Sequence, residues 1–80
     1  MTGKIIGKIE NHDYYIFECT MGYGFFEYPN SNDFNKGDLF EGNLNTFGDC
    51  IIKKVHSNET YNVYIQCFDS PSLSDVLQSL

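Results

Sequence analysis

The chain has 80 residues, with eleven Asp and Glu against five Lys and no Arg, which gives a formal net charge of −6. This length allows one domain over 1–80 with a single small core, and it excludes two separate cores. Scattered lysines without arginine exclude a phosphate-binding surface built on clustered cations, so nucleic acid is not the expected partner.

Three strands are expected in the first half of the chain, where aromatic and β-branched residues recur between turn formers. KIIGKIE predicts a strand over 3–10, in which Gly7 marks a bulge or a bend. YYIFECT predicts a second strand over 14–20, and the turn-forming NHD before it makes the two a hairpin. YGFFEY predicts a third strand over 23–28, which Pro29 ends.

Three further strands follow a polar loop of turn formers, PNSNDFNKGD. DLFEGNLN alternates and predicts a strand over 38–45, CIIKKV one over 50–55, and YNVYIQCF one over 61–68. In the last, Tyr61, Val63, Ile65 and Cys67 alternate with Asn62, Tyr64, Gln66 and Phe68, so one set faces a core. Five or six short strands linked by short turns predict a mainly β fold, a small antiparallel barrel of OB or SH3 type, with a sandwich as the alternative.

The tail SPSLSDVLQSL changes to a helical period and predicts a helix over 71–80. Its apolar residues recur at i, i+3, i+4 and i+7: Leu73, Val76, Leu77 and Leu80. Either Ser70 caps this helix with Pro71 in its first turn, or Ser72 caps it with Asp75 three residues on. Because a helix of about ten residues is not stable alone in water, we expect its apolar stripe to dock over an open end of the barrel or on a partner.

The aromatic residues are most concentrated in MGYGFFEYPN. Its segment GYGFF, residues 22–26, resembles the G-[FY]-G-F motif of cold-shock domains, which are small OB-type barrels. This resemblance, which covers five residues, implies that Tyr23 and Phe25 stack on single-stranded bases. Met21 stands where that family usually has Lys, and its second aromatic motif and basic face have no counterpart in this chain.

The same aromatic residues can instead serve the core, because large rings fill a small interior with few residues. Either Phe26 and Tyr28 or Tyr23 and Phe25 then face inward, and the neighbouring glycines relieve crowding or permit a bulge. Since successive side chains of a strand point to opposite faces, one aromatic set faces outward. An exposed aromatic patch is typical of a protein-contact surface.

No residue pattern predicts a catalytic centre, a metal site or a cofactor. The cysteines fall within predicted strands, where free Cys behaves as a small buried hydrophobe. An enzyme would need His12 or His56, both in turns, beside a cysteine or a carboxylate. Asp33 and Asp38 lie among turn formers without the residue order of a calcium-binding loop.

The location follows from what the chain lacks. No window approaches the ~20 apolar residues of a membrane span, and the N-terminus has no signal-like apolar stretch. Cys19, Cys50 and Cys67 are odd in number and widely spaced, unlike the even cysteine framework of a small secreted protein. We therefore expect a cytoplasmic protein that does not associate with membranes.

We interpret the chain as a small non-catalytic interaction module that contacts a protein partner, one with a basic surface, through an aromatic patch with an acidic rim. The contact candidates are Tyr23, Phe25, Tyr28 and Tyr64, with Glu27 and Glu41 as acidic neighbours. Two alternatives stay open. One is an OB-type protein that binds single-stranded nucleic acid. The other is an acidic mimic of nucleic acid, which requires carboxylates gathered on one face.

Overall fold

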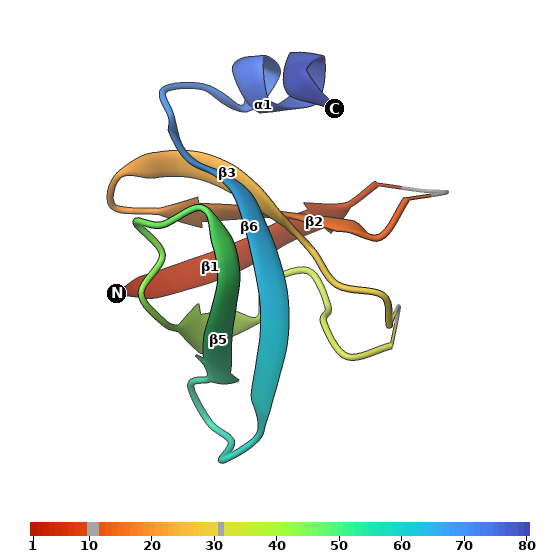
Figure 1. Cartoon of the computed structure of the whole chain (residues 1–80), viewed down its shortest axis with the longest axis vertical. Coiled ribbons are helices and arrows are strands. Elements are labelled where there is room, and N and C mark those ends of the chain that lie inside the picture. Colours follow the sequence, from red (N-terminus) through yellow and green to blue (C-terminus); the bar gives the residue numbers. More distant parts are fainter. Residues whose placement is uncertain (10–11, 31) are drawn as a thin grey trace.

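A computed structural model describes residues 1–9, 12–30 and 32–80 of the chain. It contains a closed antiparallel barrel of six strands and one short helix (Figure 1). The elements are β1 (Thr2–Lys8), β2 (Tyr14–Cys19), β3 (Gly22–Glu27), β4 (Leu39–Glu41), β5 (Gly48–Lys54), β6 (Thr60–Ser70) and α1 (Leu73–Ser79). The expected mainly β barrel with a C-terminal helix is confirmed, and the sandwich is excluded.

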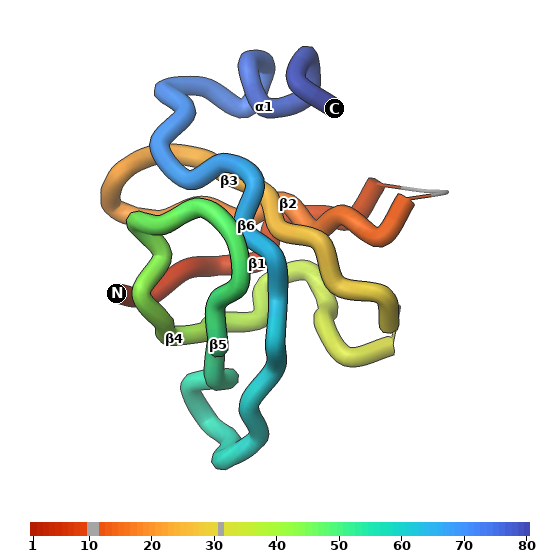
Figure 2. Tube along the Cα trace, viewed as in Figure 1, coloured from red at the N-terminus to blue at the C-terminus, as the bar shows by residue number. Residues whose placement is uncertain are grey.

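The barrel consists of two three-stranded meanders, β1–β2–β3 and β4–β5–β6, which pair along both sides. Strand β3 pairs with β6 and strand β1 pairs with β4, so each strand has a neighbouring strand on both sides. Figure 2 shows the course of the chain around the barrel. The expected hairpin of the first two strands is present. Within that prediction, Glu10 of the strand and Asn11 of the turn lie outside the described residues, as does Ser31 of the polar loop.

The barrel interior is filled mainly by aromatic rings. Its buried members are Ile5, Tyr15, Phe17, Phe26, Phe34, Phe40, Leu44, Ile52, Tyr61, Val63 and Ile65. Phe26, which is fully buried, lies edge-on to Phe34 and Phe40, with ring centroids 5.4 and 5.8 Å apart. Such edge-to-face contacts add to the free energy that burial of the rings contributes, because the positive ring edge meets the negative ring face.

Phe34 lies in the segment expected as a polar loop, but its side chain is buried. It is 4 % exposed and lies edge-on to Tyr15 and Tyr28, with a tilted contact to Tyr61. The polar residues around Phe34 hold the turns of the loop, and one ring from that loop enters the barrel.

The strand expected over 38–45 is shorter in the structure, where β4 covers three residues. The chain leaves the ladder at Gly42, where an added Cβ would lie 3.2 Å from the carbonyl oxygen of Ile51. Leu44 follows in the connection to β5 and is fully buried. The alternation over 38–45 thus predicted the burial of Leu44 correctly, although strand pairing ends before this residue.

Strand β6 contains a bulge that changes the side to which its last residues point. Phe26 pairs with Ile65 and Phe25 pairs with Cys67, which leaves one extra residue, Gln66, on β6. Consequently Cys67 packs on the outer face of the barrel and Phe68 packs against the interior cluster. The expected alternation is therefore correct up to Ile65 and wrong for Cys67 and Phe68.

Helix α1 begins as one of the two expected caps requires. The hydroxyl of Ser72 accepts a hydrogen bond from the Asp75 backbone N–H at 3.1 Å, and the helix starts at Leu73. It packs across the outer face of the barrel, above β3 and β6, and does not close an end of the barrel (Figure 1).

The apolar stripe of α1 is buried only at one residue, contrary to the prediction that all four would dock. Val76 is fully buried against Ile16 and Phe25. The three leucines of the stripe are 38–48 % exposed: Leu73, Leu77 and Leu80. The helix lies on the outer surface of the barrel, which contacts Val76 and does not cover the three leucines.

The glycines of GYGFF allow strands β3 and β6 to approach closely. A Cβ on Gly24 would collide with the backbone carbonyl of Cys67 and lie 2.7 Å from the Cα of Phe68. Gly22 has φ 130°, a conformation that side chains rarely allow, and a Cβ there would strike the carbonyl oxygen of Ser70. Both glycines therefore serve barrel closure.

Candidate functional site

The aromatic residues of MGYGFFEYPN, residues 21–30, point to opposite sides of the sheet. Phe26 and the partly buried Tyr28 belong to the interior cluster, whereas Tyr23 and Phe25 face outward. Phe25 is only 5 % exposed because α1 covers it, so it is not part of the solvent-facing surface. Tyr28 donates its hydroxyl to Asp33 Oδ2 at 2.6 Å and is likewise held in place by the fold.

The structure brings together Tyr64 and Glu27, two of the expected contact residues. They are direct partners across β6 and β3, and Asp49 on β5 is the partner of Tyr64 on its other side. Directly opposed residues of antiparallel strands have Cβ atoms about 5 Å apart. The phenol ring of Tyr64 is therefore flanked by one carboxylate on each neighbouring strand.

Ile51 extends this surface by one row along the barrel. It pairs with Asn62 and lies diagonal to Tyr64 on the outward side of β5. Ile51 is 64 % exposed and Tyr64 is 47 % exposed, although both belong to regular paired strands. We name the outward side chains of Glu27, Asp49, Ile51, Asn62 and Tyr64 the β5–β6 face.

The remaining acidic candidate, Glu41, lies apart from Tyr64. Its strand partners are Thr2 on β1 and Lys53 on β5, and it is exposed. Glu41 and Lys53 form an opposed pair of unlike charge, two rows along β5 from the row that contains Tyr64. Glu41 is thus not a neighbour of Tyr64.

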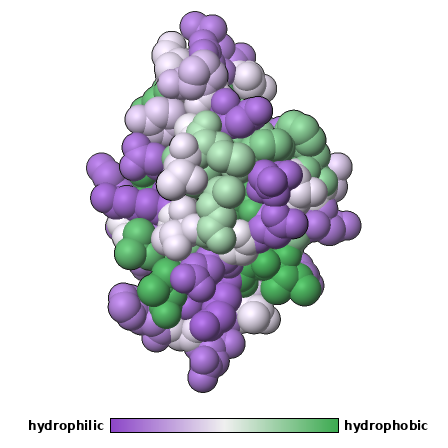
Figure 3. All heavy atoms as spheres, turned by 90° about the vertical axis from the view of Figure 1, so that its left-hand side faces the viewer, coloured by the Kyte–Doolittle hydropathy of each residue, from purple (hydrophilic) through white to green (hydrophobic). Residues whose placement is uncertain are grey.

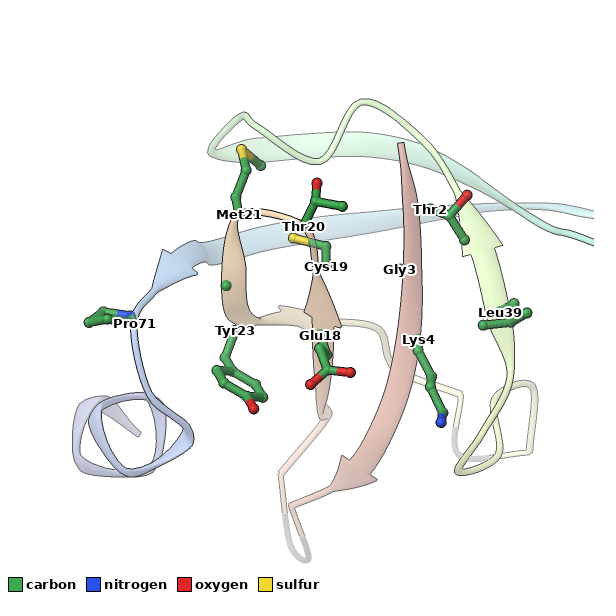
Figure 4. A pocket seen from close by; sticks show the side chains of 11 residues that line it. Thr2, Gly3, Lys4, Glu18, Cys19, Thr20, Met21, Tyr23, Leu39 and Pro71 are labelled. Atoms are coloured by element: carbon green, nitrogen blue, oxygen red, sulfur yellow. The ribbon is translucent and has the colours of Figure 1, made fainter.

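Tyr23 contributes to a separate, open groove of about 550 Å³ on the outer side of β1, β2 and β3. Register places Leu39, Lys4, Glu18 and Tyr23 in one row across four strands. Figure 4 shows Tyr23, Glu18 and Lys4 directed to the same side, with Pro71 beyond Tyr23. One aromatic ring and one lysine therefore share this groove with a carboxylate.

A third apolar area lies at the side of the barrel formed by the N-terminus and the connection between β4 and β5. Met1 is 46 % exposed, and Phe47 is 68 % exposed with its ring 4.8 Å from that of Phe68. Figure 3 shows this side, where hydrophobic atoms form patches between hydrophilic ones. Phe47 packs on Phe68, which itself packs against the interior cluster. This contact accounts for the position of the Phe47 ring without a binding partner.

Comparison with protein-family models, with curated proteins and with solved structures found no match for this chain. The resemblance to cold-shock domains thus stays a prediction, and function must be inferred from the surfaces described above. In the described ranges, no helix is long and apolar enough to cross a membrane.

Of the groups considered for catalysis, His56 and Asp38 line the same small pocket beside Lys54. His12 and His56 are both exposed, and His12 stacks on Tyr14 with ring centroids 5.5 Å apart. Burial raises the pKa of the Cys50 thiol, which disfavours the thiolate that a nucleophile requires. The part of the chain that the structure describes holds no group of three His, Cys, Asp or Glu side chains placed to bind a metal ion.

Asp33 and Asp38, the two carboxylates of the polar loop, both interact with other groups of the protein. Asp33 accepts the Tyr28 hydroxyl, and this bond raises the pKa of Tyr28 to about 12 because the neutral phenol is the donor. Asp38 accepts the Asn35 backbone N–H at 2.9 Å and forms an ion pair with Lys54 at 3.6 Å. Both residues therefore stabilise the loop around Phe34.

Ile51 and Asp49 were missed by sequence reasoning. Alternation in CIIKKV shows that one of Ile51 and Ile52 must face outward, but it does not say which. Asp49 precedes the expected strand, yet β5 begins at Gly48 and carries Asp49 outward. Only the pairing register places both beside Tyr64.

Proposed function

We propose that this protein is a small non-catalytic interaction module, which binds a protein partner through the β5–β6 face. The observation that carries the proposal is the exposure of Ile51 and Tyr64 on rigid, paired strands. An apolar pair held by a sheet loses little conformational entropy on binding, and Tyr is enriched at the energetic centres of protein interfaces. The three free cysteines support a reducing compartment, so we propose the cytoplasm as its location.

The carboxylates beside the apolar pair define the kind of partner. Glu27, which the sequence suggested as an acidic neighbour, and Asp49, which it did not, are exposed on opposite sides of Tyr64. A basic partner surface would be the electrostatic complement, and it would be attracted by the net charge of −6.

The arrangement of Tyr23 and Phe25 supports a protein partner over single-stranded nucleic acid. Base stacking on β3 would use both rings, but α1 leaves only Tyr23 at the surface. Lys4 is the one lysine in that groove, and Glu18 stands between it and Tyr23. A single ring with one cation beside a carboxylate would retain a polyanion weakly.

The acidic-mimic alternative has less support from the carboxylates. Those on strands point outward from five different strands of the closed barrel: Glu18, Glu27, Glu41, Asp49 and Asp69. Carboxylates distributed around a barrel do not form the linear array that imitates a phosphate backbone.

Affinity capture with matched variants tests the proposed surface. Ile51→Thr combined with Tyr64→Thr removes the apolar pair and places threonine, a residue that favours strands, at both positions. Leu77→Gln combined with Leu80→Gln removes two exposed apolar residues from α1 as the control. We expect a protein that the wild type and the α1 control retain and that the strand variant loses at least tenfold.

Three results would contradict this proposal. The first is a partner that the strand variant retains as well as the wild type does. The second is a partner that the α1 control loses instead. The third is oligonucleotide binding that weakens steeply with salt and disappears with Tyr23→Ala, which would favour the nucleic-acid alternative.

A further inference from the structure

The row Glu27–Tyr64–Asp49 has a more specific consequence for the partner, which rests on the proposed function. The three residues lie on adjacent strands β3, β6 and β5, directly opposite one another. Neighbouring strands are about 4.8 Å apart, so the two acidic residues are separated by about 10 Å with the phenol ring between them. All three side chains are exposed on the outer side of the barrel.

We propose that this row is a receptor site for one arginine side chain of the partner protein. A guanidinium is planar, so it can lie flat on the exposed ring of Tyr64. Its N–H groups point outward in the plane of the guanidinium, which is then parallel to the ring, toward the carboxylates on either side. Ile51, diagonal to Tyr64, offers apolar surface to the methylene groups of the same side chain.

Charge complementarity on the face supports an external cation. Pairing places Lys4 opposite Glu18 and Lys53 opposite Glu41, so these two carboxylates have a lysine of the same chain beside them. By contrast, the strand neighbours of Glu27 are Tyr14 and Tyr64. In residues 1–9, 12–30 and 32–80 one ion pair is formed, between Lys54 and Asp38.

The distance to the nearest lysine of the face also favours an external cation. Lys53 points outward on β5, four residues beyond Asp49. Four residues of strand span about 13 Å along the backbone. Among the described residues Lys53 forms no ion pair with Asp49, so the carboxylates of the row remain available to the partner.

Arginine fits this row better than lysine does. An ammonium group is a compact point charge, which can approach one carboxylate closely but cannot contact two that stand on opposite sides of a ring. A guanidinium can remain stacked while its two edges donate in opposite directions. Citrulline has nearly the same shape without the charge, so it separates stacking from charge recognition.

Peptide titrations monitored by NMR test this site directly. The probes are the capped peptides acetyl-Gly-Leu-X-Leu-Gly-amide, in which X is Arg, Lys or citrulline. We expect shifts of the Tyr64 ring signals with all three, with the Arg peptide binding at least threefold more tightly than the Lys peptide and at least tenfold more tightly than the citrulline peptide.

Two variants with the same change in net charge provide the control. Glu27→Gln with Asp49→Asn removes the proposed charges, whereas Glu41→Gln with Asp69→Asn removes two exposed carboxylates outside the row. The first variant should abolish the preference for Arg over citrulline, and the second should keep it. Equal affinity of the Arg and citrulline peptides, shifts centred away from Tyr64, or equal loss in both variants would each overturn the arginine site.

The same variants in the capture experiment distinguish failure of this inference from failure of the proposed function. If capture depends on Ile51 and Tyr64 but not on Glu27 and Asp49, the interaction surface stands and the arginine site is wrong. If capture does not depend on Ile51 and Tyr64, the proposed function itself is wrong.

Discussion

Gly24→Ala tests whether close approach of β3 and β6 determines the stability of the barrel. The new Cβ would collide with the backbone carbonyl of Cys67 and lie 2.7 Å from the Cα of Phe68. Backbone atoms of a paired strand cannot turn aside as a side chain can, so the strands must separate by about 1 Å to restore ordinary contact. The nearby interstrand hydrogen bonds would then lengthen.

The expected magnitude is large for a protein of this size. Weakening one or two buried backbone hydrogen bonds costs about 1–3 kcal/mol each, so we expect the free energy of unfolding to fall by about 3 kcal/mol. At roughly 0.05–0.15 kcal/mol per residue, the whole chain has about 4–12 kcal/mol. A loss of about 3 kcal/mol would lower the melting temperature by about 12–24 °C.

Thermal and urea unfolding followed by circular dichroism measure this effect, and Gly7→Ala is the matched control. Gly7 is also a strand glycine, but a Cβ there would meet no atom within 4 Å. Its replacement should change stability by less than about 1 kcal/mol, in either direction. A free energy of unfolding for Gly24→Ala within about 0.5 kcal/mol of the wild type, or equal destabilisation by Gly7→Ala, would show that this close approach does not control stability.

Three further outcomes are expected. Val76→Asp should release α1 and leave the barrel folded, because Val76 is the one buried residue of the helix. Hydrogen exchange should then show loss of protection in α1 alone, whereas Leu77→Gln should keep the protection of α1. Loss of protection in both α1 and the barrel would show that the helix does not unfold independently. Phe34→Ala should lower the free energy of unfolding by about 3–4 kcal/mol in urea titrations, whereas a solvated loop residue would change it by less than about 0.5 kcal/mol. Tyr28→Phe should reduce stability by about 1 kcal/mol at pH 8, where the bond to Asp33 is intact. That bond raises the pKa of Tyr28 from 10.0 to about 12, so its contribution to the free energy of unfolding is complete below pH 10 and is lost as pH rises toward 12. If the difference in stability between wild type and variant stays constant over this range, the hydrogen bond is not its cause.

The candidate site could be predicted only in part from the sequence. Tyr64 was recognised because it lies on the semi-polar side of a clearly alternating strand, and Glu27 because it is a charged residue within a strand. Which acidic residue neighbours which aromatic residue depends on register, and a change of one residue would reverse the face to which each side chain points. Asp49 and Ile51 joined the face, and Glu41 did not, because of pairings between strands distant in the chain.

The sequence by itself determined the element types and the mainly β class, and it limited the cap of the C-terminal helix to Ser70 or Ser72, because these depend on period two, turn residues and local hydrogen bonds. Only the tertiary structure decided that Phe34 enters the interior, that Cys67 faces outward past a bulge, and that α1 covers Phe25 while its leucines remain exposed. These features arise where segments far apart in the chain compete for the same limited volume. A local pattern states that a side chain is apolar, but the shape of the surrounding surface determines whether it is covered.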